Sequence, residues 1–246
     1  ILTPLDSILK KTDDSPLKTQ LNGIYRNASE LLKMVNQLLD FRKLEIKGET
    51  LQLSYCNISE FLETIAYAFN DLKNEKKITF NFACDAPNLY AYVDRDKLQK
   101  ILNNLLSNAF KFTPEEGKIT LRLMKEADTP EFQIRVTDTG CGIPEVDLPQ
   151  VFDRFYQVKN QKSPSTGSGI GLHLVKEYVV LHNGTVEVES LVGQGRTFTV
   201  TIPANLQPEE VPTTRTETGE EKQTLKLLLV EDNQEFRAFL QGELSD

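Results

Sequence analysis

Three glycines that alternate along the stretch STGSGIGL are the first residues with the spacing for chemistry. Gly167, Gly169 and Gly171 precede HLVKEYVVL, which has the pattern of a helix. Backbone N–H groups and the positive end of the dipole at a helix N-terminus can hold a phosphate. A dinucleotide fingerprint needs a strand directly before the glycines, and a P-loop needs a following Gly-Lys-Ser/Thr, so neither design applies. A phosphate site and a tightly packed helix start both remain open.

Two asparagines and a lysine share one face of a predicted apolar helix. Asn104 and Asn108 are four residues apart, and Lys111 follows about one turn later. An amide oxygen can ligate Mg²⁺ while nucleotide phosphates supply the charge, and a lysine can meet a phosphate as a point charge. Polar side chains on a helix surface are the alternative. The surrounding residues are nearly all apolar, however, so the amides are expected to be buried and hydrogen-bonded.

A third motif, DTGCGIP, begins at the end of a predicted strand. Asp138 could accept a hydrogen bond from an adenine amino group, and Gly140 and Gly142 could let the base approach. Taken alone, the motif is better explained as a β-turn in which the aspartate has its usual local role. Its meaning therefore depends on the two motifs on either side.

The elements that must position these motifs alternate between helix and strand patterns. Residues 57–77 and 95–112 have amphipathic helical patterns, the second ending before Pro114, and the glycines open a helix over 169–182. These blocks predict the α+β class, a mixed sheet with helices on one face. Alternating or β-branched patterns, with hairpin spacing between pairs, predict strands at 50–56, 78–84, 89–94, 118–127, 131–139, 185–190 and 196–203.

Upstream of this region, residues 1–47 are predicted to form a helical hairpin. Apolar residues step by three and four from Leu17 to Leu38, and TDDSP supplies turn and N-cap chemistry before them. The first arm is too short for the hairpin to close a core by itself. We therefore expect a homodimeric four-helix bundle, with a hairpin packed on its own domain as the alternative.

The composition excludes several classes of site. A formal net charge of −8 argues against a nucleic-acid-binding surface, so no direct nucleic-acid partner is expected. Three scattered cysteines and two histidines give no zinc-ligand spacing. No apolar run approaches the roughly 18 to 20 residues that span a bilayer, so no membrane contact is expected within this sequence.

The end of the sequence changes character twice. Residues 204–224 are rich in Thr, Glu and Pro and are predicted to be a linker. Residues 225–246 then combine an apolar strand, the acidic pair Glu231 and Asp232, and a helix. This last segment is too short to fold alone, and the first residues lie inside an apolar pattern. We therefore expect a fragment of a longer protein.

The three motifs, in this order, resemble the histidine kinases of two-component signalling, within the wider gyrase, chaperone and mismatch-repair ATPase superfamily. The resemblance covers residues 1–203 and implies that 48–203 are an ATP-binding catalytic domain. The matching segments are the N box NLLSNAFKFT, the first glycine box DTGCGI, the F box FDRFYQ, the second glycine box GSGIGL, and the ending LHNGTVEVES and GQGRTFTVTIP.

The resemblance gives the polar residues roles around ATP and Mg²⁺. Asn108 would be the Mg²⁺ ligand, and Asn104 and Lys111 would contact the phosphates. Asp138 would read the adenine, and Thr197 would lie on the adenine side.

The resemblance also assigns the glycines and the segment after them. Gly140 and Gly142 would give the base room, and residues 152–167 would form a lid over the nucleotide. Arg154 would hold that lid or reach the γ-phosphate. The phosphates would be wrapped by the alternating glycines Gly167, Gly169 and Gly171.

Both ends of the sequence add to the resemblance. TPLDSIL is similar to the C-terminal half of the family's H box, which would place the phospho-accepting histidine two residues before Ile1. Thr3 falls where the family often has a residue that assists dephosphorylation of a partner. LLLVEDNQEFR resembles the start of a receiver domain, with Glu231 and Asp232 as its Mg²⁺-binding pair.

The resemblance therefore implies the core of a hybrid, ATP-dependent protein-histidine kinase. The γ-phosphoryl of ATP would pass to a histidine and then to a receiver aspartate, with a homodimer and a receiver domain as partners. The parent protein would be a membrane-anchored sensor, and this sequence part of its cytoplasmic portion. The alternative is a degenerate pseudokinase, acting as a dimeric scaffold or as a receiver phosphatase. Intact Asn108, Asp138 and glycine boxes count against it.

Overall fold

The computed structural model describes residues 15–45, 50–126, 129–158 and 168–207. All of them lie in the first of two compact units, Ile1–Pro208 and Glu209–Asp246. The first arm of the predicted hairpin and the predicted receiver segment lie outside the described residues. So do four of the predicted site residues: Thr3, Gly167, Glu231 and Asp232.

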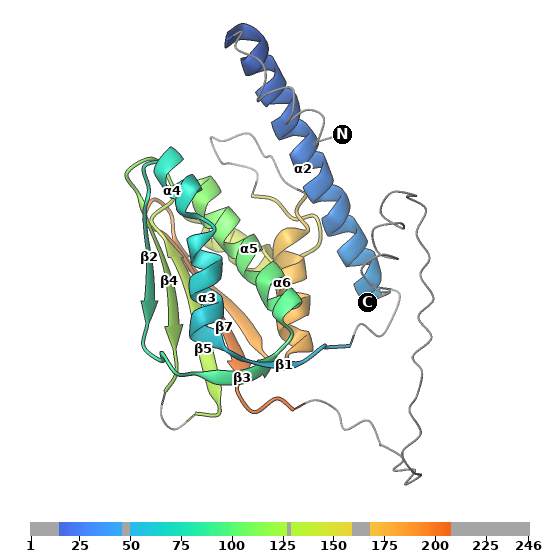
Figure 1. Cartoon of the computed structure of the whole chain (residues 1–246), viewed down its shortest axis with the longest axis vertical. Coiled ribbons are helices and arrows are strands. Elements are labelled where there is room, and N and C mark those ends of the chain that lie inside the picture. Colours follow the sequence, from blue (N-terminus) through green and yellow to red (C-terminus); the bar gives the residue numbers. More distant parts are fainter. Residues whose placement is uncertain (1–14, 46–49, 127–128, 159–167, 208–246) are drawn as a thin grey trace, which may run out of the picture. The chain divides into compact units, whose positions relative to one another are not determined.

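A five-stranded mixed sheet forms the centre of the fold, in the order β2-β4-β5-β7-β6 (Figure 1). β2 pairs with β4 in parallel, and the other three pairs are antiparallel. The predicted mixed sheet is confirmed. The strands are β2 (Thr79–Cys84), β4 (Lys118–Met124), β5 (Glu131–Asp138), β6 (Thr185–Leu191) and β7 (Gly195–Pro203).

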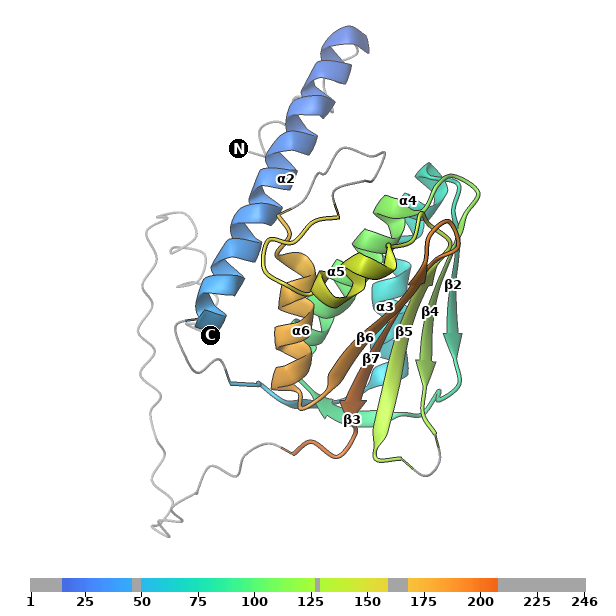
Figure 2. The same cartoon turned by 180° about the vertical axis from the view of Figure 1, so that it is seen from behind.

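Three helices cover one face of this sheet, as the two opposite views show (Figure 1, Figure 2). They are α3 (Ile58–Tyr67), α5 (Arg95–Phe112) and α6 (Gly171–Leu181). The strands alternate accordingly: Ile119 and Leu121 of β4 are fully buried under the helices, whereas Thr120 between them faces the other side. The sheet and the helices thus enclose a single apolar core.

Helix α5 carries the two predicted asparagines, and its bounds match the predicted 95–112. Asp94 caps its N-terminus by accepting a hydrogen bond from the backbone N–H of Lys97. Leu98, Ile101 and Leu105 repeat at helical spacing and are buried. Only the opposite, polar face of α5 is therefore available to a ligand.

The predicted helix over 57–77 is wrong in its length, because the chain breaks it into α3 and α4 (Asn70–Glu75). Phe69 adopts φ −94° and ψ 2° between them, and its ring stacks on Phe110 of α5 with centroids 5.4 Å apart. The strands predicted at 50–56 and 89–94 form over shorter ranges, but two features were not predicted: their pairing apart from the main sheet, and a 3-10 helix. β1 (Ser54–Asn57) and β3 (Tyr90–Val93) pair as a separate antiparallel sheet, and Glu145–Gln150 form a 3-10 helix.

Helix α2 (Ser15–Glu45) is the second arm of the predicted hairpin and contacts α6. Its Phe41 is buried, with its ring 6.2 Å from Phe155 and 5.9 Å from His173. Most other large apolar side chains of α2 are exposed, among them Leu31 at 64% and Val35 at 52%.

A buried polar network joins the end of α6 to the start of α5. The carboxylate of Asp94 accepts hydrogen bonds from the backbone N–H of Gln52 and from the ammonium of Lys97, each at 2.9 Å. The backbone N–H of Asp94 donates to Nε2 of His182, which therefore carries its proton on Nδ1 and donates it to the carbonyl of Tyr178 at 2.7 Å. Because Asp94, Lys97 and His182 are all buried, the network fixes how α6 meets β3 and α5.

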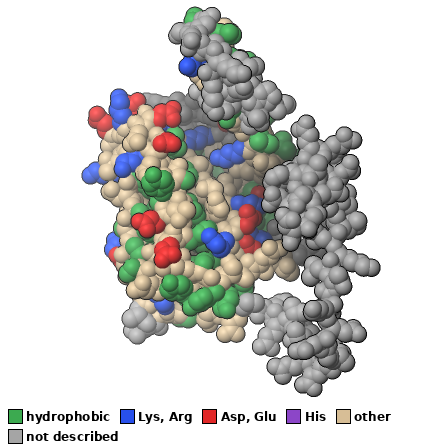
Figure 3. All heavy atoms as spheres, viewed as in Figure 1, with side chains coloured by type: hydrophobic (Ala, Val, Ile, Leu, Met, Phe, Trp, Pro, Cys, Tyr) green, Lys and Arg blue, Asp and Glu red, His purple; other side chains and the backbone are tan. Residues whose placement is uncertain are grey.

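The exposed charges are mixed in sign. On the face shown in Figure 3, acidic and basic side chains are interspersed over the part of the surface that is not grey. Within the described ranges, no helix is long and apolar enough to cross a membrane.

Candidate functional site

A cavity of about 860 Å³ lies where α5, the start of α6 and α2 meet. Asn104, Asn108 and Lys111 of α5 line it, as predicted from their spacing. Gly169 and Gly171 line it from the opposite side, at the N-terminus of α6. Two motifs that are about 60 residues apart in sequence therefore face one space.

Asn104 is held by two hydrogen bonds. Its Nδ2 donates to the carbonyl of Lys100 at 2.9 Å, and its Oδ1 accepts from Nε2 of Gln37 at 3.1 Å. The amide oxygen of Gln37 in turn accepts a hydrogen bond from the hydroxyl of Ser168 at 2.7 Å. A single glutamine of α2 thus bridges Asn104 of the N box and Ser168, which lies between the glycines of the second glycine box.

The cavity is basic although the whole chain is acidic. Among its lining residues, one carboxylate, that of Glu30, accompanies four cationic side chains. Burial lowers the pKa of the Lys111 ammonium; the charge of Glu30 opposes this shift, and those of Lys33 and Arg196 add to it. Arg196 is ion-paired with Asp138, but the three lysines have one carboxylate among the lining residues, and cations held close together with so little counter-charge favour an anionic ligand. The four cations are Lys33, Lys76, Lys111 and Arg196.

Asp138 ends β5 and is almost fully buried, with 1% of its side chain exposed. Its Oδ1 accepts from the backbone N–H of Gly140 at 2.9 Å, and its Oδ2 accepts from Nε of Arg196 at 2.8 Å. Arg196 also donates through Nη2 to the backbone carbonyl of Asn108 at 2.9 Å. The first glycine box is thereby tied to α5, and Arg196 rather than Asp138 is the member of this pair that lines the cavity.

Thr197, the residue expected on the adenine side, lies next to Arg196 in β7. Thr197 pairs in register with Thr137, and their hydroxyls are 3.0 Å apart on the face of the sheet away from the helices. Arg196 pairs in register with Asp138 on the helix-covered face. Because successive side chains of a strand point to opposite faces, Thr197 does not line the cavity, and its adenine-side role stays a prediction. The alternation around Asp138 was the signal that could have indicated Arg196.

The glycines of the first box pack against protein. A Cβ at Gly140 would lie 2.5 Å from the carbonyl oxygen of Phe112 and 2.7 Å from Oδ1 of Asp138. Gly142 has φ +72°, a conformation that L side chains rarely adopt, and lies against the backbone of Leu191. Neither glycine lines the cavity. Gly140 therefore allows Phe112 to approach closely beside Asp138, and Gly142 allows the backbone of Leu191 to approach; that these glycines give the base room stays a prediction.

Arg154, the predicted lid residue, lies beside α2. Its Nη1 forms an ion pair with Oε1 of Glu45 at 3.0 Å, and its guanidinium lies 5.0 Å from the ring centroid of Phe41. It does not line the cavity in this structure. From the described part of the predicted lid, Tyr156, Gln157 and Val158 do line it.

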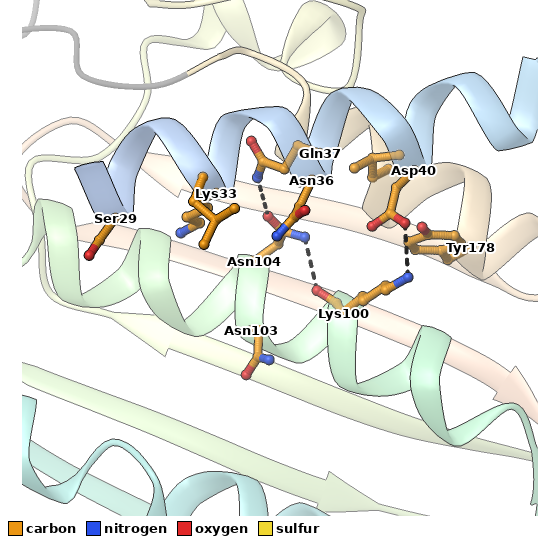
Figure 4. Close-up of a pocket in the computed structure, with 11 residues that line it drawn as sticks. Ser29, Lys33, Asn36, Gln37, Asp40, Lys100, Asn103, Asn104 and Tyr178 are labelled. Carbon is orange, nitrogen blue, oxygen red and sulfur yellow. Dashed lines mark hydrogen bonds and ion pairs between the residues drawn. The ribbon is translucent and has the colours of Figure 1, made fainter. Parts of the chain in front are cut away.

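A second cavity of about 400 Å³ separates α2 from α5 and α6 (Figure 4). Lys100 forms ion pairs of 3.0 Å with Asp40 of α2 and with Asp96 one turn before it in α5. Burial alone would lower the pKa of Lys100, but the hydrogen bonds to Asp40 and Asp96 outweigh burial and raise it. This charged contact holds α2 beside α5, and so holds Gln37 at Asn104.

The comparisons with known proteins agree with this geometry. Residues 93–206 match the family described as histidine kinase-, DNA gyrase B-, and HSP90-like ATPase. The chain is 38% identical over 215 residues to hybrid signal transduction histidine kinase D of Dictyostelium discoideum, a match that covers 85% of this chain and 14% of that protein. Sensor histidine kinase TmoS of Ectopseudomonas mendocina is 34% identical over 275 aligned residues, covering 100% of this chain and 28% of that protein.

A solved structure extends the agreement to the fold. Full-length ShkA in complex with AMPPNP superposes with a TM-score of 0.67 at 27% identity, covering 82% of this chain and 43% of that one. The chain spans less than a third of the length of the two relatives in sequence. It belongs to the family of histidine kinase-, DNA gyrase B- and HSP90-like ATPases through residues 93–206, and its relatives over most of its length are histidine kinases.

Proposed function

We propose that the 860 Å³ cavity binds ATP with Mg²⁺ and that the chain is the core of a protein-histidine kinase. One observation carries the proposal: the Asn104–Asn108 face of α5 and the glycine-rich N-terminus of α6 line the same basic cavity. An acidic chain that gathers four cations around one space supplies the field that a triphosphate needs.

The residues present fit a magnesium nucleotide. Within the described ranges, no group of three or more His, Cys, Asp and Glu side chains could hold a metal ion alone. Mg²⁺ bound mainly through phosphates and water, with Asn108 as a protein ligand, needs no such group. When bound, the ion would neutralise charge on the phosphates during transfer.

Different groups of the protein would bind the phosphates and the adenine of ATP. The first backbone N–H groups of α6 face a phosphate from the helix N-terminus, where Ile170 provides no capping side chain. Lys111 adds a point charge one turn beyond Asn108, and its pKa, lowered by burial and by neighbouring cations, would rise again beside a phosphate. Asp138 accepts a hydrogen bond from the adenine amino group. Catalysis would rest on positioning and charge neutralisation.

We infer that α2 forms a homodimeric bundle with a second copy. The exposed apolar stripe on α2 supports this inference, since two helices per copy would cover it in a four-helix bundle. The phosphoryl group would pass to a histidine upstream of Ile1 and then to a receiver aspartate. The name of the hybrid kinase relative supports a receiver in the same chain, which residues 225–246 would begin.

We propose the corresponding division of the chain: a dimerisation segment over 1–47, an ATP-binding domain over 48–203, a linker over 204–224 and the start of a receiver over 225–246. Attachment of the parent protein to a membrane stays a prediction, as do the roles of Thr3, Glu231 and Asp232. A phosphatase activity, as in the pseudokinase alternative, would need none of the phosphate contacts described above.

Calorimetric titration with ATP, with and without Mg²⁺, tests the proposal. We expect the change Asn108→Ala to weaken binding of Mg²⁺-ATP at least tenfold, or about 1.4 kcal/mol, and to weaken binding without Mg²⁺ far less. Asn103→Ala is the matched control, because Asn103 lies on the same helix but lines only the smaller cavity.

Equal affinity of Asn108→Ala and the unaltered chain for Mg²⁺-ATP would contradict the assignment. In the longer protein that carries the upstream histidine, labelling with [γ-³²P]ATP should give an acid-labile phosphohistidine, and Asn108→Ala should abolish it. A protein that binds ATP yet never labels would favour the pseudokinase alternative.

A further inference from the structure

Among the described residues, Arg196 is a charged side chain that both contacts Asp138 and lines the cavity. Its guanidinium bonds the Asp138 carboxylate at 2.8 Å and the Asn108 carbonyl at 2.9 Å. Only about 5% of its side chain is exposed, yet it lines the cavity, whereas Asp138 does not. An adenine in the cavity would therefore meet Arg196 as well as Asp138, the carboxylate expected to accept its hydrogen bond.

Two aromatic rings fix the plane of this guanidinium. Its central carbon lies 4.6 Å from the ring centroid of Phe112 and 5.8 Å from that of Phe198. The hydrogen bonds to Asp138 and Asn108 use two of the five N–H groups that a guanidinium carries. A planar group held in this way presents its other donors in a fixed direction, so it has little rotamer freedom to lose on binding a ligand.

Adenine offers complementary atoms on one edge. Its amino group donates a hydrogen bond, and the adjacent ring nitrogen, N1, accepts one. An acceptor beside a donor is the arrangement that recognises this edge, and Asp138 with Arg196 is such a pair. An aspartate alone leaves N1 without a protein donor.

We propose that Arg196 is a base-contacting residue that donates a hydrogen bond to N1 of adenine while Asp138 accepts from the amino group. The inference rests on the proposed function, because it requires ATP in this cavity. It differs from a purely structural ion pair. A structural pair needs only the contact with Asp138, whereas the position of Arg196 in the cavity lining gives the guanidinium a ligand to meet.

Two ATP analogues separate the contributions. 1-Deaza-ATP replaces N1 with C–H, and purine riboside triphosphate lacks the amino group. We expect the unaltered chain to bind 1-deaza-ATP roughly tenfold more weakly than ATP, equivalent to one lost hydrogen bond at about 1.4 kcal/mol. The change Arg196→Met removes a cavity cation and should weaken binding of both nucleotides, but it should weaken ATP binding more than 1-deaza-ATP binding, so that the discrimination disappears.

Arg196→Lys is a second variant that tests the inference even if Arg196→Met does not fold. It keeps a positive charge beside Asp138 but lacks the planar fork, so we expect a folded protein that has lost most of the discrimination between ATP and 1-deaza-ATP. In this variant the preference for ATP over purine riboside triphosphate should persist, because Asp138 still accepts from the amino group.

The outcomes are distinct. Equal binding of ATP and 1-deaza-ATP by the unaltered chain would overturn the inference and leave the proposed function standing. An equal loss of affinity for both ligands in Arg196→Lys would overturn it as well, because Arg196 would then act only by positioning Asp138. If the unaltered chain binds no ATP at all, the proposed function fails and the inference fails with it.

Discussion

Gly171 lies so close to the side chain of Asn104, in the lining of the larger cavity, that no side chain fits between them. A Cβ at Gly171 would lie 2.8 Å from Oδ1 of Asn104, closer than real Cβ contacts. Asn104 has little room to yield, because Gln37 and the Lys100 carbonyl both hold its amide. The last glycine of the second glycine box is therefore needed for the asparagine of the N box as well as for any phosphate.

Substitution of Gly171 should expose this dependence. We expect Gly171→Ala to keep the fold, since alanine suits a helix, but to displace Asn104 and weaken ATP binding roughly tenfold, about 1.4 kcal/mol. Gly23→Ala is the control: its Cβ would have nothing within 4 Å, and the change should leave affinity unaltered. Isothermal titration of both variants is the measurement. An ATP affinity for Gly171→Ala equal to that of Gly23→Ala would contradict the argument.

Residue spacing predicted one half of the site better than the other. Helical spacing placed Asn104, Asn108 and Lys111 on one face, because residues four apart on a helix are always neighbours. The spacing of residues along the sequence could not show that Arg196 forms an ion pair with Asp138. This contact depends on the register between two strands, and the two residues lie 58 positions apart in sequence. A register is set by pairing of the whole sheet and leaves only an alternation in the local sequence.

At the scale of elements, α2 has two unlike faces. One face carries Gln37, Asp40 and Phe41, which contact α5, α6 and the residues beside them. The other carries exposed apolar side chains that no described residue covers, including Leu31 and Val35. A long helix with an uncovered apolar stripe is typical of one half of a bundle.

Charges on that stripe should prevent dimerisation. We expect Leu31→Glu to convert the proposed dimer to a monomer, because the substitution would bury a carboxylate in the apolar seam of the proposed bundle. Asn22→Glu adds the same charge at an exposed position nine residues earlier, on the opposite side of α2 from Leu31, and should leave the dimer intact. Light scattering after gel filtration reports the mass of each. A monomeric unaltered chain would refute the bundle proposal.

Element boundaries followed local signals where these were strong. Pro114 was visible in the sequence as the limit of α5 at its C-terminal end, whereas Asp94, which caps the N-terminus, was assigned to the end of the strand over 89–94. The break between α3 and α4 was not visible, since a helical pattern continues through it. What interrupts the helix is the contact of Phe69 with Phe110, a residue 41 positions later.

The molecule as a whole depends on a neutral, buried histidine. His182 is fully buried and joins the end of α6 to Asp94. Burial lowers the pKa of His182 below its usual value, and the charge of Lys97 adds to this; the Tyr178 carbonyl and Asp94 oppose it only in part. A proton on Nε2 would also break the hydrogen bond from the Asp94 backbone.

Stability should therefore fall in mild acid. Since the pKa of His182 is lowered by folding, the unfolded chain gains a proton near pH 6.5 that the folded chain gains only at lower pH, so stability is lost as pH decreases below 6.5. The loss between pH 7.5 and 5.5 should reach at most about 1.4 kcal/mol.

Urea unfolding at both pH values measures this loss, and His182→Gln, whose amide oxygen can still accept from Asp94, should largely remove it. An identical pH dependence in the variant would assign the loss to other groups.

The carboxyl of Asp94 titrates below the range from pH 5.5 to 7.5, so it does not contribute to this loss. Burial raises the pKa of its carboxyl, but the hydrogen bonds from Gln52 and Lys97 lower it below 3.8 overall, so its contribution is lost only in stronger acid.

The class of the fold was predictable, and its connections were only partly so. Hairpin spacing predicted the β4–β5 pair, and alternating helix and strand patterns predicted a mixed sheet covered on one face. The parallel pairing of β2 with β4 across β3 and α5, and the separate β1–β3 pair, follow from contacts distant in sequence. Such pairings are decided by the burial of a whole sheet face, which a window of ten residues does not contain.

The single amide of Gln37 has a mechanical consequence. Its nitrogen donates a hydrogen bond to Asn104, and its oxygen accepts one from Ser168. One side chain of α2 is therefore bonded both to α5 and to the glycine-rich segment before α6, on two sides of the proposed nucleotide cavity. Successive residues of an α-helix are turned by about 100° around its axis, so even a fraction of that rotation would carry the amide away from both partners together. Movement of α2 and the geometry of the cavity are therefore thermodynamically linked. Whatever twists the helix changes the affinity for nucleotide, and bound nucleotide must bias the twist by the same free energy.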